Sequence, residues 1–520
     1  MNNKKVVIFS DVVHPVSFTR SYGPYALKGF LETSSPNTSV LIFDQFSQRP
    51  LSYWLQLLEN VNPDFILFST TFWANLDEMI HVDSLYTPSW WFTKNKSEFF
   101  YFCISLKAKF NCKILVGGHK ASDVYVDIKN QTELSNSVDF LVIGHAETVV
   151  SKIINSSSGV TCDINKQFKI ENTLVILKST EQNKFELEDK NYSPFSKSLI
   201  LPNESLLIEN SRGCIYKCKF CFYPLNNRKA SSKFLLSKSS LLDDISRNYD
   251  EFGTLDYIVN DDTFNDSTRK LEDFVKTIYK FHAYDKLRFT ANIRLDNVTK
   301  DQAKLLAEAK IIAALSGVES VDKAVTKSIG KGKLTTDKMV EASGYLHESN
   351  PKFKLTGSFI VGLPNSSTTQ IEDTANWLNS NKEVFDGIEF DPLYVFNPNW
   401  SVYDFSSTYQ LDKEFSFEEG TKLNWSNSNT PFGSFINTVP RIKELQEKLD
   451  IKYSDTLKVF ARTHLGNGYS NREQFNGVID DCLTYKDLRK KLKELNLPSL
   501  TESKKLATDK YFVLLENSLC

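Results

Sequence analysis

Long hydrophobic runs are missing from this sequence: no apolar stretch in its 520 residues approaches the roughly 20 residues that span a bilayer. The N-terminal apolar run, VVIFS, is too short for a signal-peptide core. A charge excess is also missing, because 62 basic and 64 acidic residues leave a net charge of −2. Bulk electrostatics therefore gives no strong nucleic-acid signal and no membrane partner. We expect a globular protein located in the cytoplasm.

A disulfide framework is missing as well. Five of the eight cysteines are scattered along the chain, and we expect them to be reduced thiols in a reducing compartment. These five are Cys103, Cys112, Cys162, Cys482 and Cys520. Internal repeats and low-complexity tracts are not apparent either, so the length predicts two to four ordinary domains.

The first 155 residues alternate short apolar strands with amphipathic helices, which predicts a doubly wound parallel sheet of the Rossmann-like type. Residues 74–100 interrupt this alternation and are expected to be an insertion. The expected strands are 4–10, 39–44, 65–71, 113–118 and 140–144, and the expected helices are 25–34, 51–61 and 147–155.

A second alternation runs from 205 to 395 and predicts a parallel (β/α)6 partial TIM barrel, whose chemistry belongs at the carboxyl ends of its strands. The segment 156–204 is expected to be a linker with a hairpin at 168–177. The remainder, 396–520, is expected to be a mostly helical cap or substrate region. Its aromatic tract, 394–431, could line a cavity. The six expected strands are 205–211, 255–261, 287–293, 311–317, 353–362 and 387–394.

Three cysteines occur close together in RGCIYKCKFCFYP, directly after the first strand expected in the barrel. Cys214, Cys218 and Cys221 form a C-x-x-x-C-x-x-C motif. Structural zinc sites close with four protein ligands, and most iron-sulfur clusters take four cysteines. Three thiols therefore indicate either a distant fourth ligand or a metal site that is left open.

This motif, in a loop after the first strand of six, resembles the radical S-adenosylmethionine (radical SAM) superfamily. The resemblance implies that the three cysteines hold three irons of a 4Fe-4S cluster and that S-adenosylmethionine coordinates the fourth iron. It also implies reductive cleavage of S-adenosylmethionine to a 5′-deoxyadenosyl radical. That radical abstracts hydrogen from an unactivated carbon.

The resemblance extends to residues that follow the other strands of the barrel and implies that they contact S-adenosylmethionine. Phe220 matches the family's aromatic residue before the last cysteine, and Arg294 could pair bidentately with the cosubstrate carboxylate. The other residues implied are Asp261, Asp262, Asn292, Glu319, Ser320, Ser358 and Gly362.

The N-terminal domain resembles that of the cobalamin-binding subclass of this superfamily. The resemblance implies cobalamin contacts at Ser69 and Thr71, in FSTT, and at Gly117 and Gly118, in GGHK. The cobalamin signature D-x-H-x-x-G is absent: residues 11–14 read D-x-x-H and are followed by proline. The fold could therefore bind cobalamin without a histidine ligand, or bind none.

The activity that the resemblance favours is cobalamin-dependent methylation of an unactivated carbon, which would make the protein a methyltransferase. The alternatives are a cobalamin-independent radical rearrangement, cyclisation or oxidation, and a non-catalytic metal-binding scaffold. A methylthiotransferase would need three more converging cysteines, and Cys103, Cys112 and Cys162 are poorly placed for that. The expected partners are a small-molecule or biosynthetic-intermediate substrate and an external one-electron donor such as a flavodoxin or ferredoxin. No residue is singled out as the acid, base or hydrogen donor.

Overall fold

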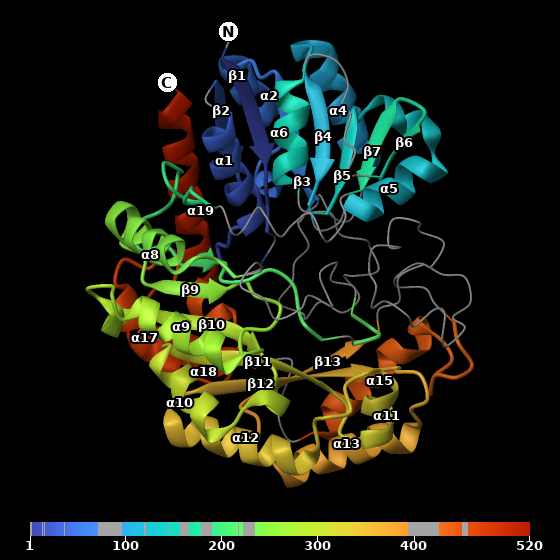
Figure 1. Ribbon diagram of the computed structural model, residues 1–520, viewed down its shortest axis with the longest axis vertical. Helices are drawn as coiled ribbons and strands as arrows, with labels where there is room; N and C mark the ends of the chain where they lie inside the picture. The colour runs from blue at the N-terminus through green and yellow to red at the C-terminus, as the bar shows by residue number, and fades with distance from the viewer. Residues whose placement is uncertain are drawn as a thin grey trace. The chain divides into compact units, whose positions relative to one another are not determined.

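The computed structural model divides into two compact units (Figure 1). Unit 1 comprises residues 1–207, 243–254 and 504–520, and unit 2 comprises 208–242 and 255–503. The residues that the structure describes are 3–12, 14, 16–35, 37–70, 96–118, 121–144, 146–156, 166–177, 190–216, 218–221, 235–393, 426–449 and 456–519.

Unit 1 is built on a seven-stranded sheet with the order β2-β1-β3-β4-β5-β7-β6 (Figure 1). All its pairings are parallel except that of β6 with β7. The first five strands have the flavodoxin-like order 2-1-3-4-5, in which the strand order reverses between β1 and β3. The strands are β1 (Lys4–Phe9), β2 (Thr38–Phe43), β3 (Phe65–Ser69), β4 (Lys113–Gly117), β5 (Phe140–Ile143), β6 (Lys166–Ile170) and β7 (Thr173–Leu177).

Helices cover both faces of this sheet, as the alternating pattern predicts. Helix α1 packs against α6, whereas α2 and α4 share an aromatic core with the strands. In that core the Phe9 ring stacks on Phe68 at 5.0 Å and meets Trp54 edge-on at 5.5 Å. The helices are α1 (Tyr22–Ser34), α2 (Leu51–Val61), α4 (Lys96–Phe110), α5 (Ala121–Asn130) and α6 (Glu147–Asn155), with 3-10 turns η1 (Phe46–Gln48) and η4 (Thr132–Asn136).

Three features of unit 1 were not in the sequence expectation. Helix α4 begins inside the segment taken for an insertion, and α5 follows β4. The hairpin placed in the linker extends the sheet, because β7 pairs in parallel with β5. The doubly wound architecture is confirmed.

The second sheet has six strands in sequence order from β8 to β13; β9 to β13 belong to unit 2, whereas β8 spans the boundary between the units. The pairings from β9 to β13 are parallel, so the carboxyl ends of these strands lie along one edge. This confirms the expected partial barrel. The strands are β8 (Leu206–Ile208), β9 (Asp256–Val259), β10 (Arg288–Ile293), β11 (Ile311–Glu319), β12 (Lys354–Val361) and β13 (Gly387–Pro392).

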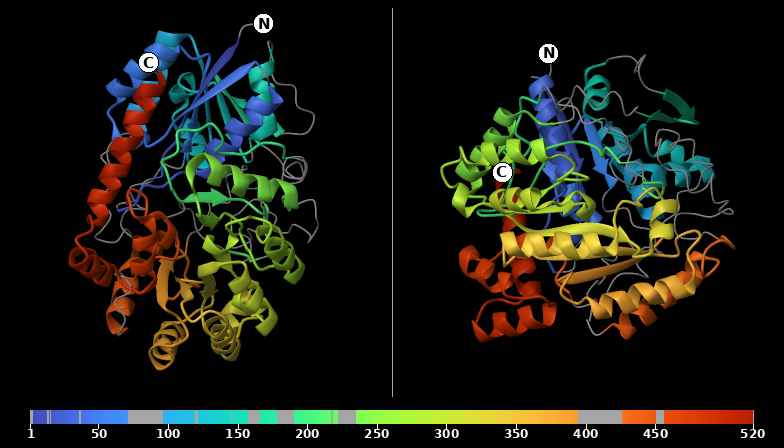
Figure 2. Two further views of the ribbon diagram at one scale, coloured as in Figure 1. Left: turned by 90° about the vertical axis from the view of Figure 1, so that its left-hand side faces the viewer. Right: turned by 60° about the horizontal axis from the view of Figure 1, so that its bottom comes forward.

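The intervening helices start at clear capping residues. Side chains of Ser267, Thr299, Asp322, Thr335 and Ser367 each accept a backbone N–H of the first turn. Helices α10, α12 and α13 lie on the same face of β11–β13 (Figures 1 and 2). The helices are α8 (Lys238–Phe252), α9 (Thr268–Ile278), α10 (Lys300–Glu308), α11 (Lys323–Ser328), α12 (Thr336–Ser349) and α13 (Thr368–Ser380), with 3-10 turns η7 (Tyr284–Lys286) and η8 (Leu295–Asn297).

The C-terminal region is helical where the structure describes it, as expected. Its last helix, α19, contributes residues to both units. Most of the aromatic tract, including Tyr394, Trp400, Tyr403 and Trp425, lies outside the described residues. Among the described helices, none has the length and apolar content to cross a membrane. The helices are α15 (Phe435–Lys448), α16 (Ala461–His464), α17 (Arg472–Asp480), α18 (Tyr485–Glu494) and α19 (Leu500–Leu519).

Candidate active site

The cysteine loop leaves β8 through a buried network centred on Asp261, which follows β9. One carboxylate oxygen of Asp261 accepts the backbone N–H groups of Asn210 and Ser211, at 2.9 and 2.8 Å. The other accepts the Ser211 hydroxyl at 2.7 Å and lies 2.7 Å from the Lys270 ammonium. Asp261, predicted to bind S-adenosylmethionine, thus already fixes the start of the loop.

The three cysteines follow within this loop. Cys218 is buried, whereas Cys214, Phe220 and Cys221 are partly exposed. Cys221 N–H donates to the Cys218 carbonyl at 3.1 Å, so a tight turn brings the last two cysteines together. The neighbouring Lys219 N–H donates to the carbonyl of Ile329, the residue after α11, which attaches the loop to the barrel.

Cys214 is positioned by the end of β9. Its sulfur lies 3.3 Å from the Thr263 hydroxyl. Burial raises the pKa of the Cys214 thiol, the hydrogen bond with Thr263 opposes that shift, and the negative charge of Asp262 raises the pKa further. Asp262, unlike Asp261, is partly exposed and acts electrostatically on a cysteine of the loop.

The end of β10 brings Arg294 to Cys218. The Arg294 Nη1 lies 3.5 Å from the Cys218 sulfur, while Nε and Nη2 bind the two oxygens of Asp296 at 2.9 and 2.7 Å. Its guanidinium also lies over the Tyr216 ring, 3.8 Å from the centroid. The fork that was expected to bind the cosubstrate carboxylate is engaged by Asp296. Asn292 is partly exposed, two residues earlier on the same strand.

Glu319 ends β11 in an unusual backbone conformation. Its φ is 67°, in the left-handed region, at a register shift between β11 and β12. The Glu319 carboxylate pairs with the Lys331 ammonium at 2.6 Å, and the same ammonium donates to the Gly317 carbonyl at 2.5 Å. A Cβ at position 317 would collide with both side chains, which explains the glycine there.

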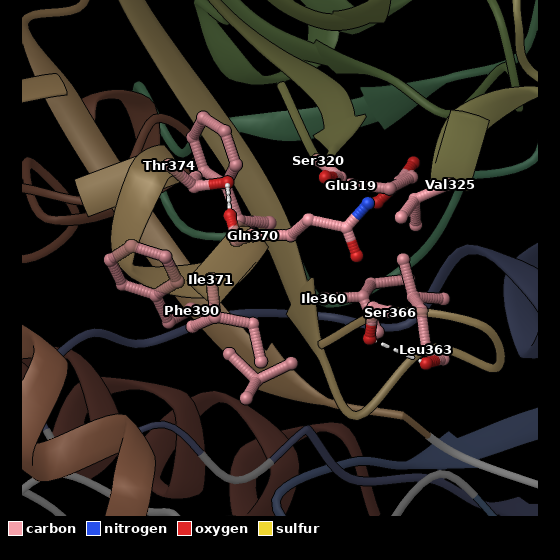
Figure 3. Close-up of a pocket in the computed structure, with 12 residues that line it drawn as sticks. Glu319, Ser320, Val325, Ile360, Leu363, Ser366, Gln370, Ile371, Thr374 and Phe390 are labelled. Atoms are coloured by element: carbon pink, nitrogen blue, oxygen red, sulfur yellow. Dashed lines mark hydrogen bonds between the residues drawn. The ribbon is translucent and has the colours of Figure 1, made fainter. Parts of the chain in front are cut away.

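A small pocket lies beside Glu319 (Figure 3). Glu319 and Ser320 line one side, and Gln370 extends across it toward Glu319. The predicted residues Ser358 and Gly362 are not among its lining residues; Ser358 is partly exposed on β12 and Gly362 follows that strand with φ 92°. The remaining lining is mostly apolar: Val325, Phe359, Ile360, Val361, Leu363, Ser366, Ile371, Thr374 and Phe390.

The residues predicted to bind cobalamin lie at the carboxyl edge of the sheet in unit 1. Ser69 ends β3, Gly117 ends β4, and Gly118 follows with φ 95°. Thr71 lies outside the described residues. The sequence interpretation missed Thr70, whose buried hydroxyl donates to the Gly117 carbonyl at 2.8 Å and joins the ends of β3 and β4.

The loop after β1 carries Asp11 and His14, whose spacing differs from that of the cobalamin signature. Asp11 is buried and accepts the Ser47 N–H at 2.6 Å. Burial raises its pKa to about 7, although Ser47 hydrogen bonds and the Lys504 charge lower it. The His14 carbonyl accepts the Lys504 ammonium at 2.5 Å, and its Nδ1 accepts the Val16 N–H at 3.4 Å. His119 and His145 lie outside the described residues.

A comparison with known protein families matches one part of the chain. A sequence profile of the radical SAM superfamily matches residues 208–378, from the last residue of β8 into α13. The chain contains a radical SAM domain. That domain includes the three cysteines and Arg294, Glu319 and Gly362, and its presence supports an enzyme.

Two curated relatives are similar to parts of this chain. "Uncharacterized methyltransferase PH0819" of Pyrococcus horikoshii is 27% identical over 170 residues, which cover 32% of this chain and 35% of that protein. "Ribosomal protein uS12 methylthiotransferase RimO" of Bdellovibrio bacteriovorus is 24% identical over 224 residues, 41% of this chain and 47% of that protein. The matches thus span less than half the length of either relative.

Solved radical SAM structures share the fold over most of the chain. The methyltransferase TsrM of Kitasatospora setae, with tryptophan and a SAM analogue bound, has a TM-score of 0.59 at 13% identity and covers 80% of this chain and 77% of its own. The cobalamin-dependent enzyme OxsB, with aqua-cobalamin and S-adenosylmethionine bound, has a TM-score of 0.54 at 14% identity. This match covers 99% of the present chain and 79% of the OxsB chain. At these identities the similarity establishes the fold.

The donor set fits the cluster that radical SAM domains use, together with S-adenosylmethionine. In the part of the chain that the structure describes, no three His, Cys, Asp or Glu side chains converge on a single metal ion. Three thiolates that bind three different irons of one cluster need not converge on a point. Cys214, Cys218 and Cys221 lie along one loop and supply the three thiolates that such a cluster needs.

The two described thiols of unit 1 do not resemble a second cluster site. Cys103 and Cys112 are buried in unit 1, and burial raises the pKa of both, that of Cys112 to about 11. Such thiols stay protonated and behave as apolar core residues. Cys162, the third candidate for a methylthiotransferase cluster, lies outside the described residues.

Three further residues were missed by the sequence interpretation. Thr263 contacts Cys214 and Lys331 contacts Glu319. Neither pair has a sequence spacing that would predict the contact. Asp391, on β13, was missed as well: burial and the charge of Glu389 raise its pKa to about 6, and Lys458 partly opposes them. Its position at the carboxyl end of the sixth strand was the available clue.

Proposed function

We propose that this chain is a radical SAM enzyme that methylates an unactivated carbon of a small-molecule or biosynthetic-intermediate substrate, with cobalamin bound to unit 1. One observation carries the proposal: a three-cysteine radical SAM domain and a flavodoxin-order sheet occur in one chain. OxsB, a cobalamin-dependent radical enzyme, has the same combination of folds over 99% of this chain.

In this proposal, the residues of unit 2 hold and shape the radical SAM site. Cys214, Cys218 and Cys221 bind the cluster, and Asp261 keeps their loop attached to β9. Once reduced by an external one-electron donor, the bound cluster would supply the electron that cleaves S-adenosylmethionine to methionine and a 5′-deoxyadenosyl radical. Glu319 contributes a carboxylate whose position Lys331 fixes, at the pocket beside β11 and β12.

The small residues of unit 1 support the cobalamin part. Ligands of open α/β sheets bind at the carboxyl ends of strands, at the switch in strand order, which here lies between β1 and β3. Ser69 and Gly117 end β3 and β4, Thr70 and Gly118 follow them, and these four residues leave little side-chain bulk at that edge. His14 is not spaced as in the D-x-H-x-x-G signature, so we propose binding without a histidine ligand.

The cluster is tested by anaerobic reconstitution of the full chain. We expect about four irons per chain and release of 5′-deoxyadenosine on reduction. A Cys214/Cys218/Cys221 triple alanine variant should lose both. Cys482→Ala is the matched control, because Cys482 is a buried thiol outside the loop and its loss should affect neither. Retention of iron and cleavage in the triple variant would contradict the proposal.

The cobalamin part is tested by expression with hydroxocobalamin, followed by cobalt analysis and visible spectroscopy of the purified protein. We expect close to one cobalt per chain. Gly118→Val should reduce this stoichiometry, because Gly118 has a positive φ and stands against the end of β3. A folded wild-type protein without cobalt would instead favour the cobalamin-independent rearrangement, cyclisation or oxidation.

A further inference from the structure

Arg294 has three simultaneous partners, and each constrains a different part of its guanidinium. Asp296 binds the edge formed by Nε and Nη2, and the Tyr216 ring covers one face at 3.8 Å. The remaining nitrogen, Nη1, lies 3.5 Å from the Cys218 sulfur. Because a guanidinium is planar and presents its N–H groups in a fixed fork, holding one edge and one face also fixes the direction of Nη1.

The backbone of Arg294 is held just as firmly by Asn265, which is fully buried. The Asn265 side-chain oxygen accepts the Arg294 N–H at 2.8 Å, and its amide nitrogen donates to the Arg294 carbonyl at 3.0 Å. Tyr216 is held in turn, since its hydroxyl donates to the Asn297 side chain at 2.8 Å. The Nη1 position is therefore built into the fold.

The charge of this group is permanent. Burial lowers the pKa of Arg294, but the hydrogen bonds and charge of Asp296 outweigh that effect and raise it above its usual range. The negative charge of Asp296 makes the Arg294–Asp296 pair neutral overall. The N–H of Nη1 is nevertheless directed at a sulfur, and N–H groups directed at ligand sulfurs are among the features that set the potential of iron-sulfur clusters.

We propose that Arg294 is a positioning residue that tunes the cluster: its Nη1–H donates to the Cys218 thiolate and raises the reduction potential of the bound cluster. The inference rests on the proposed function, in which Cys218 binds that cluster. The donor stabilises the reduced state more, because reduction adds negative charge to the cluster and its sulfurs. Arg294 thus acts on the protein side of the cluster, whereas the sequence suggested a contact with the cosubstrate carboxylate.

The experiment is an EPR-monitored redox titration of the reconstituted full-length protein, without S-adenosylmethionine, for wild type and Arg294→Met. Methionine keeps much of the side-chain length and removes the charge and the N–H donors. We expect the midpoint potential of Arg294→Met to become more negative. If the one-electron equilibrium constant falls about tenfold, the shift is about 59 mV.

Arg288→Met is the matched control. Arg288 begins the same strand, β10, and binds Asp480 in the same bidentate manner, at 3.0 and 2.8 Å. It sits at the opposite end of the strand from Arg294. Its loss should cost stability without changing the midpoint potential. An equal shift in both variants would overturn the inference, because the effect would then come from general loosening of the barrel.

The outcomes separate this inference from the proposed function. Failure of the wild-type protein to assemble a cluster would refute the proposed function itself. An intact cluster with an unchanged potential in Arg294→Met would overturn the tuning role alone. If Arg294→Met assembles no cluster, the same titration is made on Arg294→Gln, which keeps a neutral polar group. A midpoint potential more negative than that of wild type would support the tuning role, and an unchanged one would overturn it. Loss of the cluster in both variants, with Arg288→Met intact, would overturn tuning in favour of a role in assembly.

Discussion

Asp261 and Asp262 are neighbours in sequence, but their side chains have different surroundings. Asp261 is buried and accepts hydrogen bonds from the start of the cysteine loop, whereas Asp262 is partly exposed and close enough to Cys214 to influence its pKa. The sequence indicated both as ligands of S-adenosylmethionine. The contacts give Asp261 a positioning role, and Asp262 stays a predicted contact of S-adenosylmethionine.

Asp261→Asn is expected to destabilise the protein. An amide would place N–H groups against the backbone donors of Asn210 and Ser211 and would leave the buried Lys270 ammonium with only its more distant partner, Asp266, at 3.6 Å. Breaking a buried pair of this kind costs about 3–5 kcal/mol. Denaturation by urea measures the change. Asp273→Asn, which breaks an exposed pair with Lys238, should cost less than about 1 kcal/mol, and equal effects would contradict this reading.

For Asp391 we expect the opposite effect: replacing this aspartate by asparagine should stabilise the protein. Its pKa in the folded protein is raised to about 6, so its ionised form is disfavoured by folding. The penalty is absent below the unfolded pKa, near 4, grows as pH rises, and is complete above about pH 6. Asp391→Asn should therefore be more stable than wild type at pH 7.5, by roughly 1–3 kcal/mol, but not at pH 4.

The measurement is the urea midpoint of both proteins across this pH range. Asp373→Asn serves as the control, because Asp373 is exposed on α13 and should show little pH-dependent difference from wild type. A stability gain of Asp391→Asn that is independent of pH would show that its origin is not ionisation. A gain above pH 6 would mark Asp391 as a residue kept at the expense of stability.

At the scale of elements, the sequence predicted most strands of both sheets to within one or two residues. Short apolar runs bounded by polar residues determine parallel strands locally. Helix α4 was not predicted, because its apolar side chains surround the helix: Phe99 and Cys103 are buried, whereas Tyr101 and Ile104 are exposed. No amphipathic period results, and only tertiary packing reveals the helix.

The partners of the site residues were less predictable than the elements. Arg294 was recognised as a residue able to bind a carboxylate, but the sequence could not show that Asp296 would supply it. Both carboxylates satisfy the same guanidinium geometry. The choice depends on the path of the chain after β10, where Asn265 fixes the backbone. Likewise, the pairing of the hairpin with β5 depends on long-range register, which no local pattern encodes.

Helix α12 is attached to the sheet of unit 2 by a pair of titratable groups. The His347 Nε2 lies 3.1 Å from Asp386, whose same oxygen accepts the Leu355 N–H. The hydrogen bond to Asp386 raises the pKa of His347. Asp386 has a lowered pKa: burial raises it, but the hydrogen bonds from His347 and Leu355 lower it by more.

The sign of the pH dependence follows from these two shifts. A histidine with a raised pKa stabilises the fold fully below its unfolded pKa, near 6.5, and loses this contribution as pH rises through the folded value. The aspartate contribution is present above about pH 4 and is lost as pH falls. The stability difference between wild type and His347→Gln should therefore be largest near pH 5–6 and shrink by pH 8.5. Urea midpoints at pH 5.5 and 8.5 measure it, and a difference that grows with pH would contradict the assignment.

At the scale of the molecule, unit 1 is built from segments that lie far apart in the sequence. Residues 504–519 of α19 belong to unit 1, and the Tyr511 hydroxyl accepts the Asp44 N–H at 2.8 Å across 467 residues of sequence. Asp44 belongs to a fully buried ionic cluster in which Arg20 binds Glu204 at 2.5 and 3.0 Å and Tyr25 donates to Asp44 at 2.8 Å. The Arg20 guanidinium also lies over the Tyr511 ring, at 4.9 Å.

These contacts of Tyr511 predict that α19 stabilises unit 1. Tyr511→Ala removes a fully buried ring and the hydroxyl that satisfies the Asp44 N–H, so unit 1 should lose about 3–5 kcal/mol. Hydrogen exchange should then show weaker protection in β2 and the segment after it, far from the substitution in sequence. Val513→Ala, on an exposed position of the same helix, should change stability by about 0.5 kcal/mol or less. Exchange that rises only within α19 would mean that the helix frays alone and that the buried cluster holds unit 1 together without it.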